Sequence, residues 1–191
     1  MNKPTGDTLA TTVLAPLFAN EYKIYINHTD AGGIVYHANH LVFFENCRRD
    51  WFTQLGLEGY FMQDEKGQVQ HFVVRQADLQ FKKAILLDET ITVQIDKVEL
   101  KPASIVFYQS IHRKRADNNH HEQTFTTDSL LSSTKIVIAC VQNKVLPESA
   151  NHNNVNTNNA VDAINANPMR PIRVPKTLHD TIKDAILQHN Q

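Results

Sequence analysis

The chain has 191 residues, a formal net charge of -1 and a hydrophobic share of 41%. This length provides for one ordinary domain with extensions, but hardly for two. A net charge so close to zero creates no long-range field that attracts polyanions, so the composition gives no support for general binding to nucleic acids or membrane surfaces. We therefore expect one core and a local functional site.

The cysteines and the apolar runs indicate the compartment. Only two cysteines occur, Cys47 and Cys140, each inside an apolar run. Two distant cysteines of this kind are typical of buried thiols in a reducing compartment rather than of a disulfide framework. The first twenty residues hold no apolar stretch of signal-peptide length, and no run approaches the roughly 20 residues that span a bilayer. We predict a cytoplasmic protein without membrane insertion.

The first part of the chain predicts a leader, a short strand and a turn. Residues 1–20 are rich in Thr, Ala and Asn and sustain no hydrophobic period, which indicates a flexible leader. We expect order from about Glu21, because polar and apolar positions alternate over Tyr22–Ile26 and predict a strand there. Residues 28–33 combine Asp with two glycines and so predict a sharp turn.

A helix is predicted over Asn39–Leu55. Apolar residues recur there at every third or fourth position, and Gly56 is placed to cap the C-terminus. Further apolar residues, among them Val42 and Phe52, lie off this stripe, so the helix would be hydrophobic on more than one face. Such a helix should lie inside a wrapping structure.

Four later segments predict the strands of an antiparallel meander. They are rich in β-branched and aromatic residues, and alternation is clearest after Thr90, as expected for a sheet with one buried face. A short turn at residues 101–103 and a long polar loop at residues 115–128 join them. Together with the first strand they would form a five-stranded sheet, with both chain termini outside the core. The four segments are Val69–Phe81, Thr90–Leu100, Ser104–His112 and Leu130–Val141.

The end of the chain predicts an insertion and a last helix. Residues 148–168 are rich in asparagine and offer little that could pack, which indicates a disordered insertion after a core domain of residues 21–147. Residues 169–191 predict an extended segment followed by a helix that begins after Pro175.

The pair His120 and His121 raises the question of a metal site. Adjacent histidines in a strand point to opposite faces, and no cysteine or carboxylate stands at a ligand-like spacing from them. We interpret the pair as part of a solvated loop tip and predict no metal site.

Asp30 is the first candidate for chemistry. It lies between the predicted strand and the predicted helix, in a glycine-containing turn where the backbone can approach a ligand closely. An Asp before Ala-Gly-Gly is also common in ordinary turns, so the position alone does not decide between a catalytic and a purely structural role for Asp30.

His37 and Glu45 are further candidates. His37 stands where the helix begins, and the free N–H groups and partial positive charge of a helix N-terminus suit an oxygen that develops negative charge. The alternative is that the His37 ring only packs or hydrogen-bonds at the helix entry. Glu45 lies amid apolar helix residues, where a carboxylate faces either solvent or a site. The residues alone leave these alternatives open.

A longer motif resembles the signature of a known family. The run from Tyr25 to Glu45, YINHTDAGGIVYHANHLVFFE, resembles that of the 4-hydroxybenzoyl-CoA thioesterase group of the hotdog-fold superfamily, and within it the Tol-Pal-associated acyl-CoA thioesterase branch. Residues 72–75, 88–89 and 170–175 also resemble that branch. The resemblance covers roughly residues 21–145 and the C-terminal segment.

This resemblance implies a hotdog fold, which is an α+β fold with an antiparallel sheet wrapped around a central helix. It also implies hydrolysis of an acyl-CoA thioester to the free acid and CoA, with no metal and no cofactor. Asp30 would act as nucleophile or general base, and the backbone N–H of His37 would polarise the thioester oxygen. The implied substrate-binding residues are Tyr36, Glu45, Lys101 and Arg170, the last two as cations for the CoA phosphates.

The expected partners are the acyl-CoA substrate and an acyl carrier protein. Because a single sheet leaves an open edge, we also expect further copies of the chain, joined edge to edge in a homodimer or homotetramer. The chain departs from the family pattern in its longer segments at residues 115–128 and 148–167, and in His28, where the family often has an acidic residue. These departures bear on substrate preference. A competing hypothesis is a non-catalytic hotdog module that binds acyl carrier protein or envelope-associated partners. A hotdog dehydratase ranks lower, because it would usually require a differently arranged His and carboxylate.

Overall fold

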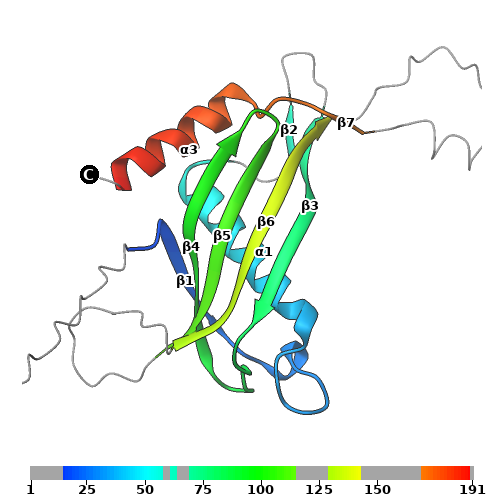
Figure 1. Ribbon diagram of the computed structural model, residues 1–191, viewed down its shortest axis with the longest axis vertical. Helices are drawn as coiled ribbons and strands as arrows, with labels where there is room; N and C mark the ends of the chain where they lie inside the picture. Colours follow the sequence, from blue (N-terminus) through cyan, green and yellow to red (C-terminus); the bar gives the residue numbers. More distant parts are fainter. Residues whose placement is uncertain (1–14, 58–60, 64–68, 115–128, 143–168, 190–191) are drawn as a thin grey trace, which may run out of the picture.

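The computed structural model describes residues 15–57, 61–63, 69–114, 129–142 and 169–189. Within them the chain forms a seven-stranded sheet in the order β1-β4-β5-β6-β3-β2, with β7 against β6, and every strand pair is antiparallel (Figure 1). The elements are β1 (Phe18–Lys23), the 3-10 helix η1 (Ile26–His28), α1 (His37–Gln54), β2 (Phe61–Gln63), β3 (Val69–Phe81), β4 (Thr90–Lys101), β5 (Ser104–Arg113), β6 (Leu130–Gln142), β7 (Arg170–Pro171) and α3 (Lys176–His189).

The four long strands are confirmed to within about a residue at each end. The predicted total of five strands is wrong, because β2 and β7 are too short for a sequence pattern to reveal them. The predicted antiparallel sheet on one central helix is confirmed. Two predictions concern segments outside the described residues and stay untested. They are the solvated loop with His120 and His121 and the disordered Asn-rich insertion.

The first strand begins earlier than its pattern indicates. β1 pairs with β4 from Phe18 to Lys23, so the predicted bounds Tyr22–Ile26 are wrong, and residues 18–20 belong to the sheet rather than to a leader. The alternation is hidden because a polar residue, Asn20, occupies a half-buried position of β1. Its amide donates a hydrogen bond of 2.7 Å to Asp50 on α1, which also accepts the hydroxyl of Tyr22.

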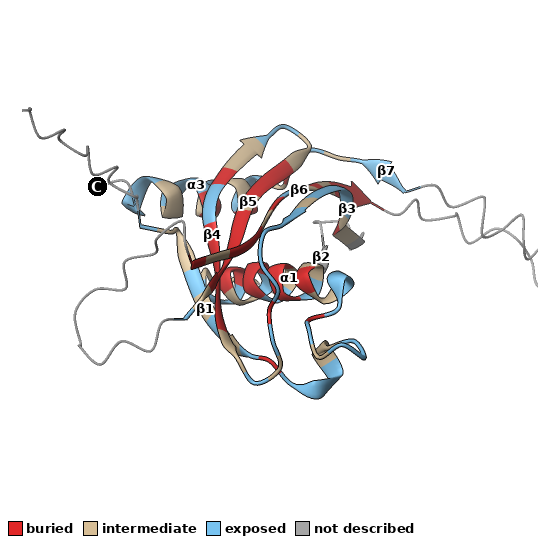
Figure 2. Ribbon diagram, turned by 60° about the horizontal axis from the view of Figure 1, so that its bottom comes forward, coloured by how far each residue is buried: buried red, intermediate tan, exposed pale blue. Residues whose placement is uncertain are grey.

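Helix α1 packs on the sheet through aromatic side chains. Trp51 and Phe52 lie against Phe107 of β5, with ring centroids 6.1 and 6.0 Å apart, and Phe44 is fully buried. Figure 2 shows that the buried residues gather on α1 and on the strands facing it. Each such aromatic ring contributes about 2–3 kcal/mol through its burial, so this contact dominates the core.

The opposite face of α1 stays exposed, which differs from the predicted enclosure of the helix. The sheet of one chain covers one broad side of the helix only. The helix ends as predicted: Gly56 has a φ of 70°, and the amide of Leu57 donates to the carbonyl of Phe52 at 2.9 Å, which closes the last turn. Apart from the terminal residues His37 and Gln54, the exposed residues of α1 form one stripe, which consists of Ala38, Val42, Asn46, Arg49 and Thr53.

The C-terminal helix belongs to the core, contrary to the prediction that both termini lie outside it. α3 lies beside β4 at the end of the β4–β5 hairpin (Figure 1), and its Leu178 and Ile182 are buried. The amide of Val174 donates to the carbonyl of Pro102 at 3.0 Å and ties the preceding segment to that hairpin. The apolar stripe of the last helix is thus used for packing.

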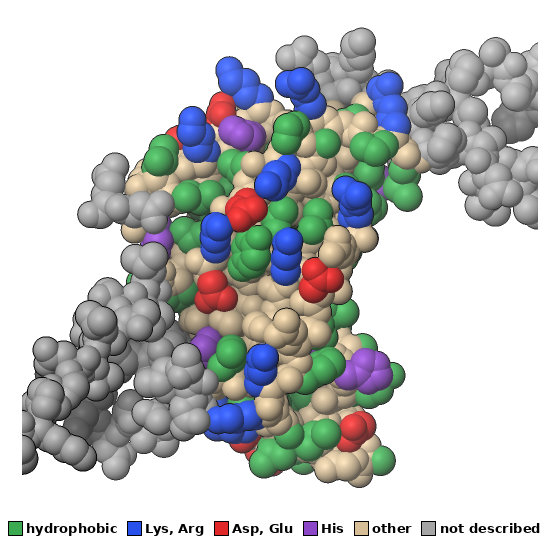
Figure 3. Space-filling model, in the orientation of Figure 1, with side chains coloured by type: hydrophobic (Ala, Val, Ile, Leu, Met, Phe, Trp, Pro, Cys, Tyr) green, Lys and Arg blue, Asp and Glu red, His purple; other side chains and the backbone are tan. Residues whose placement is uncertain are grey.

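Two remaining features concern the surface and the thiols. Figure 3 shows Lys and Arg interspersed with Asp and Glu over the side of the molecule that it displays. One ion pair of the sheet surface joins Lys97 and Glu99 at 2.8 Å. Cys47 and Cys140 are buried free thiols, as predicted. No helix in the described part of the chain is long and apolar enough to cross a membrane.

A buried polar bridge fixes α1 on the sheet. Arg48 of α1 is 1% exposed and donates a hydrogen bond of 2.7 Å to the side-chain oxygen of Gln109 on β5. The amide of Gln109 donates in turn to the carbonyl of Phe44 at 3.0 Å. The guanidinium lies 5.8 Å from the centre of the Phe107 ring. Gln109 therefore connects one nitrogen of the buried Arg48 guanidinium to a carbonyl of the helix.

Replacing Gln109 by leucine should destabilise the protein by about 2 kcal/mol, because the buried Arg48 charge loses a hydrogen-bond acceptor. Urea unfolding followed by circular dichroism measures this loss. Gln188→Leu, on the exposed end of α3, makes the same chemical change without a buried partner and should cost less than about 0.5 kcal/mol. Equal stability of the two variants would contradict the role of the bridge.

Candidate active site

The turn that carries Asp30 is closed by its own backbone. The amide of Asp30 donates to the carbonyl of Ile34 at 2.9 Å, and the amide of Gly33 donates to the carbonyl of Asp30 at 3.1 Å. Gly33 has a φ of 74°, which favours glycine. A Cβ atom at Gly32 would lie 3.1 Å from the Asp30 Oδ1, so glycine also leaves room for the carboxylate.

The Asp30 carboxylate is exposed and only half engaged. Its Oδ1 accepts a hydrogen bond of 2.8 Å from the amide of Gly32, and its Oδ2 has no partner among the described residues. One oxygen therefore holds the side chain in place, while the other is available to a substrate or a water molecule.

Helix α1 begins at His37, two residues before the predicted start. Tyr36 is the N-cap residue and provides no side-chain cap, and the amide of Asn39 donates to the Tyr36 carbonyl at 2.8 Å. The amides of His37 and Ala38 have no acceptor within the described part of the chain. Unpaired amides at a helix N-terminus carry a partial positive charge and suit an oxyanion.

One pocket of about 350 Å³ joins these features. It brings Asp30 of the turn and His37 of the helix start together with the end of β3 and the loop that follows β3. The two catalytic residues predicted from the sequence thus line the same space. Its other lining residues are Ile34, Val35, His40, Phe81, Lys82, Lys83, Ala84 and Ile85.

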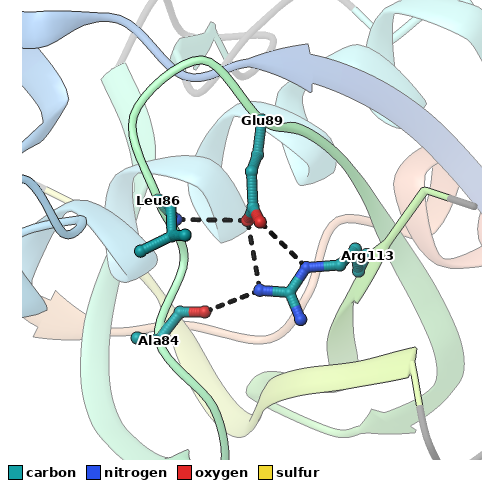
Figure 4. Close-up of polar contacts among 4 residues, drawn as sticks. All are labelled: Ala84, Leu86, Glu89 and Arg113. Atoms are coloured by element: carbon teal, nitrogen blue, oxygen red, sulfur yellow. Dashed lines mark hydrogen bonds and ion pairs between the residues drawn. The ribbon is translucent and has the colours of Figure 1, made fainter.

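The loop between β3 and β4 is held by an ion pair. Arg113 of β5 binds the Glu89 carboxylate through two nitrogens, at 3.0 and 3.2 Å, and donates to the carbonyl of Ala84 at 2.8 Å (Figure 4). Glu89 also accepts the amide of Leu86 at 3.1 Å. Both side chains are partly buried, which gives this bidentate pair a fixed geometry. The pocket wall at Ala84 therefore has a rigid support.

Backbone hydrogen bonds connect this loop to the Asp30 turn. The amide of Val35 donates to the carbonyl of Ile85 at 2.8 Å, and the amide of Leu87 donates to the carbonyl of Gly33 at 3.1 Å. The position of the Asp30 carboxylate relative to the pocket wall is therefore set by main chain on both sides.

His40 forms a buried part of the pocket that the sequence analysis did not identify. It lies one helical turn after His37, and its Nδ1 is 2.9 Å from the hydroxyl of Ser132 on β6. Burial lowers the pKa of His40 to about 4, and the charge of His37 is a second, smaller cause of this shift. The imidazole is therefore neutral at physiological pH.

The other four predicted site residues do not line the pocket. Tyr36 is exposed, with its ring 4.2 Å from that of His37, and Glu45 is half-buried two turns along α1. Lys101 lies at the far end of β4, whose 12 residues at about 3.3 Å each carry it roughly 36 Å along the strand. Arg170 of β7 donates to Gln142 at 3.0 Å, at that same far end.

The pocket residues that the sequence analysis missed carry no local signal. Lys82 and Lys83 follow an ordinary strand, and Phe81 looks like one more strand residue. They reach the site only because β3 ends beside the start of α1, which is a tertiary contact. Among the described residues, no three His, Cys, Asp or Glu side chains gather as metal ligands.

Comparison with known proteins relates this site to named relatives. The Thioesterase superfamily profile matches residues 32–117. The acyl-CoA thioesterase YbgC of Haemophilus influenzae is 31% identical over 124 residues, which is 65% of this chain and 80% of that protein. The acyl-CoA thioester hydrolase YbgC of Escherichia coli is 28% identical over 125 residues, 65% of this chain and 82% of the relative.

Solved structures share the fold. A probable thioesterase from Bartonella henselae superposes with a TM-score of 0.55 at 23% identity, covering 83% of this chain and 97% of that one. A 4-hydroxybenzoyl CoA thioesterase in complex with 4-hydroxybenzoyl CoA superposes with a TM-score of 0.56 at 16% identity, covering 86% and 95%. These superpositions confirm the predicted hotdog fold. The chain therefore belongs to the Thioesterase superfamily and, within it, to the family of the YbgC acyl-CoA thioesterases.

Proposed function

We propose that this protein hydrolyses acyl-CoA thioesters to the free acid and CoA, with Asp30 as the catalytic carboxylate and the backbone N–H of His37 as oxyanion donor. The observation that carries the proposal is the pocket in which an exposed carboxylate lies together with the unpaired amides of a helix start. The names of the YbgC relatives support the same activity.

Two routes use these groups. In the first, Asp30 takes a proton from a water molecule, the resulting hydroxide attacks the thioester carbon, and the C–S bond breaks to release the CoA thiolate. In the second, a carboxylate oxygen of Asp30 attacks the carbon, CoA thiolate leaves, and water hydrolyses the mixed anhydride. In both, negative charge develops on the thioester oxygen, which the amide of His37 stabilises.

The expected contributions suffice for an activated substrate. General base catalysis accounts for about 10²–10⁴-fold, and one oxyanion donor for on the order of 3 kcal/mol. The partial charge of the helix N-terminus adds to the second effect, because the amides of His37 and Ala38 have no competing acceptor among the described residues.

For the CoA portion we favour Lys82 and Lys83 as cations. Both lie at the pocket that holds Asp30, whereas Lys101 and Arg170 lie at the opposite end of the sheet within one chain. Lys101 is in addition 3.5 Å from Glu99, which offsets its charge. Tyr36 stays a candidate for contact with the substrate, because its ring lies 4.2 Å from that of His37. Glu45 is not among the residues that line the pocket, so nothing supports its predicted role.

Replacing Asp30 by asparagine should lower kcat by roughly 10² or more and change KM much less, because the side chain keeps its shape but loses the base or nucleophile. Hydrolysis of a panel of acyl-CoAs, followed by release of free CoA, measures both constants. His37→Ala should be milder, since the proposed oxyanion contact uses the backbone. Asp180→Asn, on the exposed face of α3, serves as the matched control and should leave kcat unchanged.

Turnover near the wild-type rate in Asp30→Asn would contradict the catalytic role of Asp30. The competing hypothesis of a non-catalytic module that binds acyl carrier protein or envelope-associated partners predicts no hydrolysis of any acyl-CoA by the wild type. The same panel therefore separates the two functions.

We also propose that two copies join through β3. β3 pairs with β6 along its length, but β2 covers only residues 69–71 of its other edge, so among the described strands residues 72–81 have one neighbour. An open edge of this length invites pairing with another strand. Val74 and Phe81 on this strand are each 54% exposed, and Phe81 also lines the pocket. A partner at this edge would lie next to the site.

Sedimentation equilibrium at micromolar concentration should give a dimer or a dimer of dimers. Val74→Glu should weaken the association at least tenfold, because it places a charge on the proposed edge. Leu187→Glu is the control, since Leu187 is similarly exposed, at 51%, but lies on α3. A wild-type monomer, or equal effects of the two variants, would refute the β3 interface.

A further inference from the structure

His40 is a buried polar group in the pocket for which the proposed hydrolysis has no use. It is 4% exposed, it lines the pocket with Asp30 and His37, and its surroundings there include the apolar side chains of Val35, Ile85 and Phe81. An imidazole in such a place costs free energy unless it is hydrogen-bonded.

The ring of His40 is fixed from two sides. Its Nδ1 lies 2.9 Å from the hydroxyl of Ser132, which is itself completely buried on β6. The ring of Phe81 contacts it edge to face, with centroids 5.0 Å apart and an interplanar angle of 83°. With Nδ1 occupied, Nε2 is the ring atom left to bind a ligand.

His40 lines the pocket, and its Nε2 has no hydrogen-bond partner among the described residues. Because the ring is uncharged at physiological pH, Nε2 offers a single hydrogen bond, as donor or acceptor according to the direction of the bond with Ser132. A hydroxyl group pairs with either form, since it donates and accepts.

We propose that His40 is a specificity-determining residue that selects acyl groups bearing a hydroxyl group over the corresponding hydrocarbon acyl groups. This inference rests on the proposed function, because it takes the pocket beside Asp30 to be the acyl-binding site. An acyl hydroxyl that reaches Nε2 completes the hydrogen bonding of the His40 ring. A hydrocarbon chain in the same place displaces water from Nε2 and leaves this atom without a hydrogen bond. Sites that reject a ligand in this way discriminate more strongly than apolar pockets do.

Binding of CoA thioethers tests this selection without depending on turnover. The probes carry a methylene between the sulfur and the acyl carbonyl, and their acyl group ends in a phenyl ring or a propyl chain. Each unsubstituted probe is compared with a set of probes that bear a single hydroxyl, one probe for each carbon of the ring or chain. Isothermal titration calorimetry gives Kd for each pair. The wild type should bind at least one hydroxylated probe about tenfold tighter than its unsubstituted partner.

The variants then assign that preference to His40. In His40→Phe, which keeps an aromatic ring beside Phe81, the ratio of the two Kd values should fall below about twofold. In His40→Gln, which retains a hydrogen-bonding group, part of the preference should remain. Ser132→Ala should reduce it, because Nδ1 loses its anchor, and this variant keeps the test available should His40→Phe fail to fold.

The proposal is overturned if the wild type prefers no hydroxylated probe, or if His40→Phe weakens both members of each pair equally and leaves their ratio intact, as a purely structural role requires. Wild type that binds the thioethers but hydrolyses no acyl-CoA would refute the proposed function, while the ratio of Kd values would still decide the role of His40.

Discussion

The burial of α1 against one face of the sheet is the constraint on which the rest of the structure depends. The aromatic contacts of Trp51 and Phe52 with Phe107 hold the C-terminal half of the helix at the middle of the sheet. Because a helix is a rigid rod, fixing this half also fixes where the N-terminal half lies. The first turn of α1 is thereby placed beside the end of β3, where the pocket forms.

Two polar contacts give this packing a defined register. Arg48 binds Gln109 on β5, and His40 binds Ser132 on β6, so the helix is tied to two different strands at points about 12 Å apart along its axis. Apolar packing alone tolerates a slide or a rotation of the helix, whereas a displaced Arg48 or His40 would lose a buried hydrogen bond. The same contacts that specify the fold thus determine where the His37 amide lies relative to Asp30.

The sequence predicts those features that depend on residues close together in the chain. Runs of β-branched and aromatic residues predict the four long strands. Only seven positions separate Asp30 from His37, so a turn followed by a helix start brings them together. Features that depend on distant segments could not be predicted. In the sequence His40 is one more residue of the predicted helix, and only the packing of β3 and β6 against it makes it part of the pocket. Lys101 is predicted to bind the CoA phosphates, but the length of β4 places it at the other end of the sheet.

Large apolar side chains are exposed around the pocket, next to the Asp30 carboxylate and the two exposed lysines, Lys82 and Lys83. Ile34, Tyr36, Leu86 and Phe81 are all large and exposed, and Ile34 pairs with Leu86 across the turn and the loop. Exposed apolar residues that gather at one place mark surfaces that bind something. Apolar walls also lower the local dielectric, which strengthens the interaction of the helix amides with a developing oxyanion. An acyl chain, or a second copy at the adjacent β3 edge, would cover these apolar residues and exclude water from Asp30. The exposure of these side chains is unfavourable in the single chain, but it provides the apolar contact surface that the proposed site needs once it is occupied.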